Sequence, residues 1–104
     1  MGLFILNILN KIFQNKNYSI YKVNTKNNPY PYVVHNTNKP YEESHTHVQN
    51  FGLCKIMIYC CLKGEAPKKS KSLLKNKRFV ESLTRVATNK HYNKFSRLLD
   101  ELNN

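Results

Sequence analysis

The sequence feature that most constrains the fold is an apolar segment that runs from Phe51 to Leu62 and is interrupted by Lys55. A helix needs about 18 consecutive apolar residues to cross a bilayer, and this segment is shorter. It is therefore predicted to be a helix buried in the core of a globular protein. No membrane is expected among the partners of the chain.

The cysteines predict the compartment. All three, Cys54, Cys60 and Cys61, lie inside the apolar segment. An odd number of cysteines, with neither a secretion signal nor a disulfide-type spacing, is typical of free, buried thiols in a reducing compartment. We therefore expect a cytoplasmic protein.

Two kinds of hydrophobic spacing precede the apolar segment. Residues 1–15 are expected to form an N-terminal amphipathic helix, because their apolar side chains recur at helical spacing. These side chains are Ile5, Ile8, Leu9, Ile12 and Phe13. Residues 18–36 are expected to form a β-hairpin, because Tyr18–Asn24 and Tyr30–Asn36 are rich in aromatic and β-branched residues and flank a polar loop.

Residues 46–103 are predicted to be helical. Thr46 and Gln49 have the spacing of a capping box, so the central apolar helix is expected to begin there. It is expected to end before Gly64, which suits the residue after a helix C-terminus. A basic turn and two further helices, the first ending near Ala87, are expected to follow.

Together these elements predict one α+β domain over residues 1–104 in which helices dominate. The expected order is an N-terminal helix, a β-hairpin, and then three helices packed around the central apolar helix. Since that helix is apolar nearly all round, a homodimer that buries part of the first or last helix is a further expectation.

The charge of the chain predicts its partners. Seventeen Lys and Arg stand against six Asp and Glu, a formal net charge of +11, which favours polyanionic partners. Eleven of the basic residues lie from Lys63 to Arg97, where the only acidic residues are Glu65 and Glu81. The candidate nucleic-acid-binding residues are Lys63, Lys68, Lys69, Lys71, Lys75, Lys77, Arg78 and Arg85.

Lysine ammonium groups suit phosphate oxygens and release counterions when they bind them. Such contacts position a nucleic-acid backbone and read little sequence. The predicted partner is therefore RNA or DNA, or a nucleoprotein complex. The alternative is an ordinary solvated basic face.

Tyrosines crowd the predicted hairpin, and Tyr30, Tyr32 and Val34 are expected to share one face. Exposed aromatic rings beside lysines can stack on single-stranded bases, so Tyr30 and Tyr32 are candidate stacking residues. The alternative is that this face packs against the helices.

The histidines offer the only cluster with metal-like chemistry. His45 and His47 lie near His35 and the acidic pair Glu42 and Glu43. They are predicted at a loop-to-helix junction without a cysteine pair at ligand spacing, so we expect no metal and no other cofactor. A small RNase that uses His35, His45, His47 or His91 with a lysine is an alternative. Because the sequence contains no recognised catalytic motif, no catalytic residue is assigned.

Several short stretches carry a resemblance to other proteins. Lys39–Tyr41, Ser44–Val48, Leu73–Leu74 and Glu81–Val86 resemble segments of small uncharacterised proteins of low-GC Gram-positive bacteria and of their phages or plasmids. The resemblance spans about residues 32–95. It implies an accessory protein of a mobile element and brings no established activity with it.

The sequence thus predicts a small, basic, non-enzymatic accessory protein of a phage or mobile element. It is expected to bind nucleic acid or a ribonucleoprotein through its lysine-rich face. An alternative from another class is an anti-CRISPR-like inhibitor that binds a host defence protein. The small RNase is a third alternative.

Overall fold

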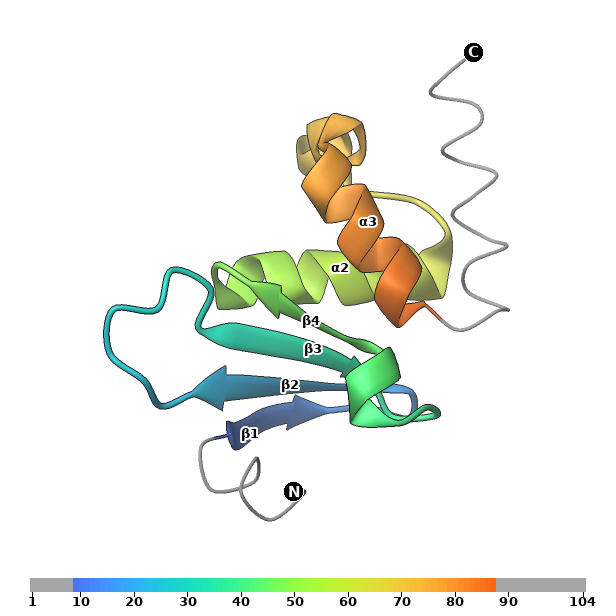
Figure 1. The fold of residues 1–104 in the computed structure, drawn as a ribbon. Coiled ribbons are helices and arrows are strands. Elements are labelled where there is room, and N and C mark those ends of the chain that lie inside the picture. The colour runs from blue at the N-terminus through green and yellow to red at the C-terminus, as the bar shows by residue number, and fades with distance from the viewer. Residues whose placement is uncertain (1–8, 88–104) are drawn as a thin grey trace.

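The computed structural model describes residues 9–87, which form a four-stranded antiparallel sheet and the helices that pack against it (Figure 1). In chain order the elements are β1 (Leu9–Gln14), β2 (Tyr18–Val23), β3 (Tyr32–Asn36), the 3₁₀ helix η1 (Tyr41–Glu43), β4 (His45–Val48), α2 (Phe51–Lys63), the 3₁₀ helix η2 (Lys68–Lys75) and α3 (Lys77–Val86).

The sheet is a meander in which each strand pairs with the next along the chain, in the order β1-β2-β3-β4. The first turn is tight because the Asn15 side-chain oxygen accepts hydrogen bonds from the backbone N–H groups of Asn17 and Tyr18, at 2.9 and 2.8 Å. The longer loop between β2 and β3 and the helix η1 lie at opposite ends of the sheet (Figure 1).

The two faces of the sheet have different environments, because side chains alternate along each strand. Ile20, Val34 and Thr46 are aligned across β2, β3 and β4 on the face that meets the helices. Ile20 and Val34 are fully buried. Tyr21, which is paired with Val33 in the next strand, lies on the opposite side, which we call the outer face.

Helix α2 supplies most of the core on the helix-facing side. Its buried residues are Cys54, Met57, Ile58, Cys60 and Cys61. They form one cluster with residues from β2, β3, β4 and α3. The helix ends at Gly64, whose φ of 70° is a left-handed conformation that favours glycine.

Helix α3 is held against both α2 and the sheet. Its buried residues Phe79, Leu83 and Val86 enter the same cluster. The Thr46 hydroxyl of β4 donates a hydrogen bond of 2.9 Å to the Ser82 hydroxyl of α3. The side chain of Asn76 caps the helix by accepting from the Phe79 N–H.

The predicted N-terminal helix over residues 1–15 is wrong where the structure describes it, because residues 9–14 form strand β1. The register of β1 against β2 shifts between Lys11 and Phe13, which marks a β-bulge. Ile12 at this bulge is 40% exposed while Phe13 packs against the core. The adjacent apolar residues Ile12 and Phe13 fit a helical pattern in the sequence, but in the structure the bulge accounts for their adjacency. The rest of the predicted helix, residues 1–8, lies outside the described residues.

The predicted helix start at Thr46 is also wrong. Thr46 and His47 belong to strand β4, which pairs with β3, and α2 begins only at Phe51. The N-cap is Asn50, whose side chain accepts a hydrogen bond of 2.8 Å from the Leu53 N–H. The capping-box spacing of Thr46 and Gln49 was therefore coincidental.

These changes overturn the helix-dominated architecture. The predicted hairpin is present, but as the central pair β2–β3 of a four-stranded sheet. Within residues 9–87 the fold is α+β, with a sheet that precedes α2 and α3. The predicted helix after Asn89 lies outside the described residues. Within residues 9–87, no helix combines the length and the apolar character that crossing a membrane requires.

Replacing the helix cap tests the revised start of α2. We expect Asn50→Ala to lower the free energy of unfolding by about 1 kcal/mol, because it leaves an N–H at the helix start without its partner. Gln49→Ala is the control: it should change stability by less than about 0.5 kcal/mol, since Gln49 is exposed and precedes the cap. Urea unfolding measures both. A larger loss for Gln49→Ala than for Asn50→Ala would instead support the capping box.

Candidate nucleic-acid interface

Six lysines from the end of α2 to the start of α3 form an exposed basic surface, which we call the lysine surface. Its residues are Lys63, Lys68, Lys69, Lys71, Lys75 and Lys77, all exposed. Most lie on η2, which Figure 1 places at the end of α3 farther from the sheet. Within the described chain, none of the six ammonium groups has a side-chain hydrogen bond or an ion pair. Their charges are therefore available to a ligand.

The two arginines of the predicted site have partners within the protein. The Arg78 guanidinium carbon lies 4.0 Å from the centre of the Tyr30 ring, a cation–π contact. Arg85 donates hydrogen bonds to the backbone oxygens of His45 and Glu42, at 2.7 and 2.9 Å. Arg78 thus links α3 to the β2–β3 loop, and Arg85 links α3 to η1 and β4.

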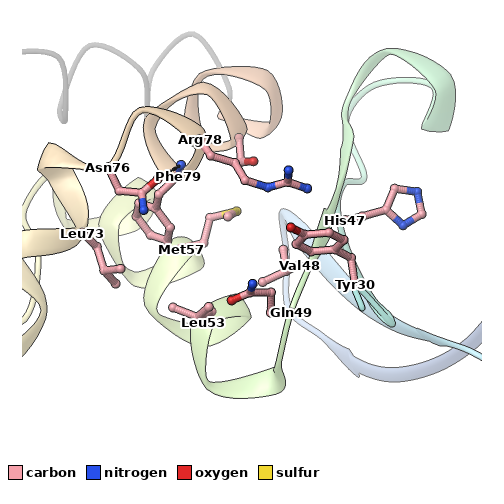
Figure 2. A pocket seen from close by; sticks show the side chains of 11 residues that line it. Tyr30, His47, Val48, Gln49, Leu53, Met57, Leu73, Asn76, Arg78 and Phe79 are labelled. Atoms are coloured by element: carbon pink, nitrogen blue, oxygen red, sulfur yellow. Dashed lines mark hydrogen bonds between the residues drawn. The ribbon is translucent and has the colours of Figure 1, made fainter. Parts of the chain in front are cut away.

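A small pocket lies beside the lysine surface, where the β2–β3 loop, β4, α2, η2 and α3 meet. Its volume is about 140 Å³. Figure 2 shows Leu53 and Met57 of α2 in the pocket wall, Arg78 reaching toward Tyr30, and His47 pointing away. The full lining is Tyr30, His47, Val48, Gln49, Leu53, Met57, Leu73, Asn76, Arg78, Phe79 and Ser82.

The two predicted stacking tyrosines have different surroundings. Tyr32 belongs to β3 and packs against Phe51 of α2, with 6.2 Å between the ring centres. Its ring therefore covers the core, as the alternative prediction held. Tyr30 precedes β3, is partly exposed and lines the pocket. Of the two, only Tyr30 is next to a residue of the predicted basic site.

A row of aromatic rings occupies the outer face of the sheet and η1. Tyr41 stacks on His45, with ring centres 4.0 Å apart and planes 8° apart. His35 and Tyr41 meet edge to face, with ring centres 5.4 Å apart. His45 and His47 meet in the same way, with the same distance between their ring centres. Tyr21 extends the row at 6.5 Å from His35. These contacts exist because His45 and His47 lie on a strand, where alternate side chains share a face.

The environment of His45 makes it a poor proton acceptor. Its Nδ1 lies 2.6 Å from the Tyr41 carbonyl oxygen and therefore donates to it. Burial lowers the pKa of His45 below its ordinary value; the hydrogen bond to the Tyr41 carbonyl opposes this, and His47, Arg85 and His35 lower it further. Burial, together with Tyr21 and Glu42, raises the pKa of the Tyr41 hydroxyl.

The histidine row bears on two sequence predictions, the absence of a metal and the alternative of a small RNase. Among residues 9–87, no three His, Cys, Asp or Glu side chains lie close enough to hold one ion. His45 and His47 are adjacent, as the RNase hypothesis requires, but no described lysine is hydrogen bonded to either. The fourth candidate histidine, His91, lies outside the described residues. The RNase hypothesis stays a prediction.

The three cysteines are free thiols inside the core. Burial raises the pKa of Cys54 and Cys61 to about 12 and that of Cys60 to about 11. The reactive thiolate is therefore scarce at neutral pH.

The sequence did not indicate the pocket itself. Tyr30 and Arg78 were each predicted as site residues, but nothing in the sequence pairs a loop tyrosine with the start of α3. Leu53, Met57 and Phe79 have the spacing of ordinary core residues. Only the position of α3 on the sheet brings these side chains together.

The described residues thus define a protein with an antiparallel sheet, helices on one face, and a basic surface beside a small pocket. No protein-family model matches the chain, no curated protein is similar to its sequence, and no solved structure matches its fold.

Thiol reactivity tests the burial of the cysteines. At about pH 8 we expect the native protein to react with a thiol-specific disulfide reagent on the order of a hundredfold more slowly than the unfolded chain, because the buried thiols stay protonated. Absorbance of the released thiolate measures both rates, and the same protein in guanidinium chloride is the control. Rapid reaction of all three thiols in the native state would contradict the structure.

The lowered pKa of His45 predicts a pH dependence of stability. Because folding favours neutral His45, its contribution is present above the ordinary histidine pKa of about 6.5 and is lost as the pH falls through the lowered folded value. We expect His45→Gln to lose less stability than the wild type between about pH 7.5 and about pH 5 in urea unfolding. An equal loss in both proteins would contradict this role.

Proposed function

We propose that this protein binds nucleic acid through the lysine surface, as a small non-enzymatic accessory protein. The observation that supports the proposal most strongly is that all six lysines are exposed on one short segment, from the end of α2 to the start of α3, and have no hydrogen-bond or ion-pair partner among residues 9–87. A chain that used these charges for its own stability would pair them with carboxylates, but the nearby Glu65 is the only acidic residue between Lys63 and Arg78.

The kind of cation on this surface indicates how it binds. Lysine side chains meet phosphate oxygens as flexible point charges, so they hold a backbone without fixing a base sequence. Arginine, which forms bidentate contacts with bases, contributes only Arg78 and Arg85 to the predicted site, and both contact the protein itself. The proposed binding is therefore strongly dependent on salt and weakly dependent on sequence.

The proposal includes a reducing, cytoplasmic compartment and an origin in a phage or mobile element. The three free, buried cysteines support the compartment. The origin rests on the resemblance of residues 32–95 to small proteins of such elements.

Charge reversal on η2 tests the proposal. Binding of fluorescently labelled RNA and DNA is followed by anisotropy at several salt concentrations. We expect the quadruple variant Lys68→Glu, Lys69→Glu, Lys71→Glu and Lys75→Glu to weaken binding at least about tenfold. For a single strand, the slope of log affinity against log salt concentration should become less negative by about 3. Each of the four lost phosphate contacts accounts for about 0.7 of this change.

A second quadruple variant serves as the matched control. Lys11→Glu, Lys16→Glu, Lys26→Glu and Lys39→Glu make the same change in net charge at exposed positions on the sheet side of the molecule. We expect this variant to keep most of the affinity. Equal losses in the two variants would show that only net charge matters and would contradict a defined surface. A protein partner that co-purifies after nuclease treatment, without any nucleic-acid binding, would favour the inhibitor hypothesis instead.

A further inference from the structure

We infer that the pocket beside the lysine surface binds one unpaired nucleobase, so that the ligand is single-stranded RNA or DNA. This inference rests on the proposed function and specifies its ligand. The juxtaposition that supports it is a pocket lined by Tyr30, Arg78 and Phe79 whose lining residue Asn76 lies between Lys75 and Lys77 in the sequence.

The size of the pocket limits its occupant to a single small group. Its volume of about 140 Å³ is well below the 300–1,000 Å³ that is typical of pockets for drug-sized ligands. A single flat ring system, held by its two faces and by one polar edge, is of a size that suits this volume. A whole folded ligand, or the side of a double helix, does not enter a space of this size.

The walls of the pocket suit a flat aromatic group. Leu53, Met57, Leu73 and Phe79 provide apolar contacts, and Met57 adds a polarizable thioether. The Tyr30 ring lines the pocket across from α2 and α3 (Figure 2), where Arg78 covers one face of the ring and leaves the other for a second flat group. Bases that leave a stack are commonly held between apolar and aromatic side chains of this kind.

The rim of the pocket offers donors for the edge of a base. The Arg78 guanidinium stacks on Tyr30 through its flat face, which leaves the N–H groups at its edge available. Within the described chain, these N–H groups donate no hydrogen bond. The exposed carboxamide of Gln49 also lines the pocket. Since single-stranded bases are recognised by hydrogen bonds to their free edges, these two groups can orient a base that enters.

Charge favours a nucleotide over the aromatic side chain of a protein partner. None of the residues that line the pocket is acidic, and Arg78 is a cation at its rim. Lys75 and Lys77 flank the lining residue Asn76, so the phosphates on either side of an inserted base have cations to meet. A paired base cannot enter, because its edge and both of its faces are already occupied in the duplex.

A tryptophan reporter tests this inference, because the chain contains no tryptophan of its own. Tyr30→Trp keeps an aromatic ring beside Arg78 and places the only tryptophan at the pocket. We expect adenine-rich RNA and DNA single strands of about ten nucleotides to quench its fluorescence, and a duplex of equal length to quench it far less. Tyr59→Trp is the control, because Tyr59 lies on α2, is 37% exposed and does not line the pocket.

A second variant measures the contribution of the ring to affinity. In anisotropy we expect Tyr30→Ala to weaken single-strand binding by about tenfold, the scale of one base stacked on an aromatic side chain. Duplex binding should be unchanged, and Tyr59→Ala should affect neither ligand. Comparing the affinities for RNA and DNA single strands shows which of the two nucleic acids the pocket prefers.

The two assays separate the failure of this inference from the failure of the proposed function. Anisotropy that reports binding, without quenching of Tyr30→Trp and without loss in Tyr30→Ala, would overturn the base pocket and leave the lysine surface in place. The absence of any anisotropy change with wild-type protein would overturn both. Quenching by an acidic, aromatic peptide but by no oligonucleotide would overturn the inference in favour of a protein partner.

Discussion

The rest of the structure depends on the packing of α2 against one face of the sheet. Cys54, Met57 and Ile58 of α2 are buried in one cluster with Ile20 and Val34. This contact covers the apolar segment, which is too apolar to remain exposed and too short to span a membrane. It also leaves room beside β4 for α3. The lysine surface and the pocket both follow from where α3 begins.

The sequence predicted the buried helix and the β2–β3 hairpin, because long apolar runs and alternating strands are strong local signals. It failed at β1 and β4, which are the two edge strands. Ile12 and Phe13 are adjacent apolar residues at a bulge, and Thr46 and Gln49 have a helix-cap spacing on a strand. Pairing with β2 and β3 decides these segments, and such tertiary contacts are not readable from local spacing.

The candidate site was predictable only in part, because some of its features are local in the sequence and others depend on tertiary contacts. Clustered lysines are visible in the sequence, and the structure leaves all six exposed. The partners of Arg78 and Arg85 depend on the docking of α3, which brings Arg78 to Tyr30 and Arg85 to the carbonyl of His45. Among residues 9–87, the predicted basic residues therefore divide into exposed lysines without a side-chain partner and two arginines that contact the rest of the protein. The pocket lies at the boundary between them.

The most direct test of nucleic-acid binding at the lysine surface is to map amide chemical-shift changes by NMR while a short single-stranded oligonucleotide is added. If the strand binds the lysine surface and the pocket, the largest changes will fall on residues 63–78 and around Tyr30, which together contain the lysine surface and part of the pocket lining. Changes concentrated instead at His35, His45 and His47 would place the nucleic acid on the outer face of the sheet. That result would contradict binding at the lysine surface.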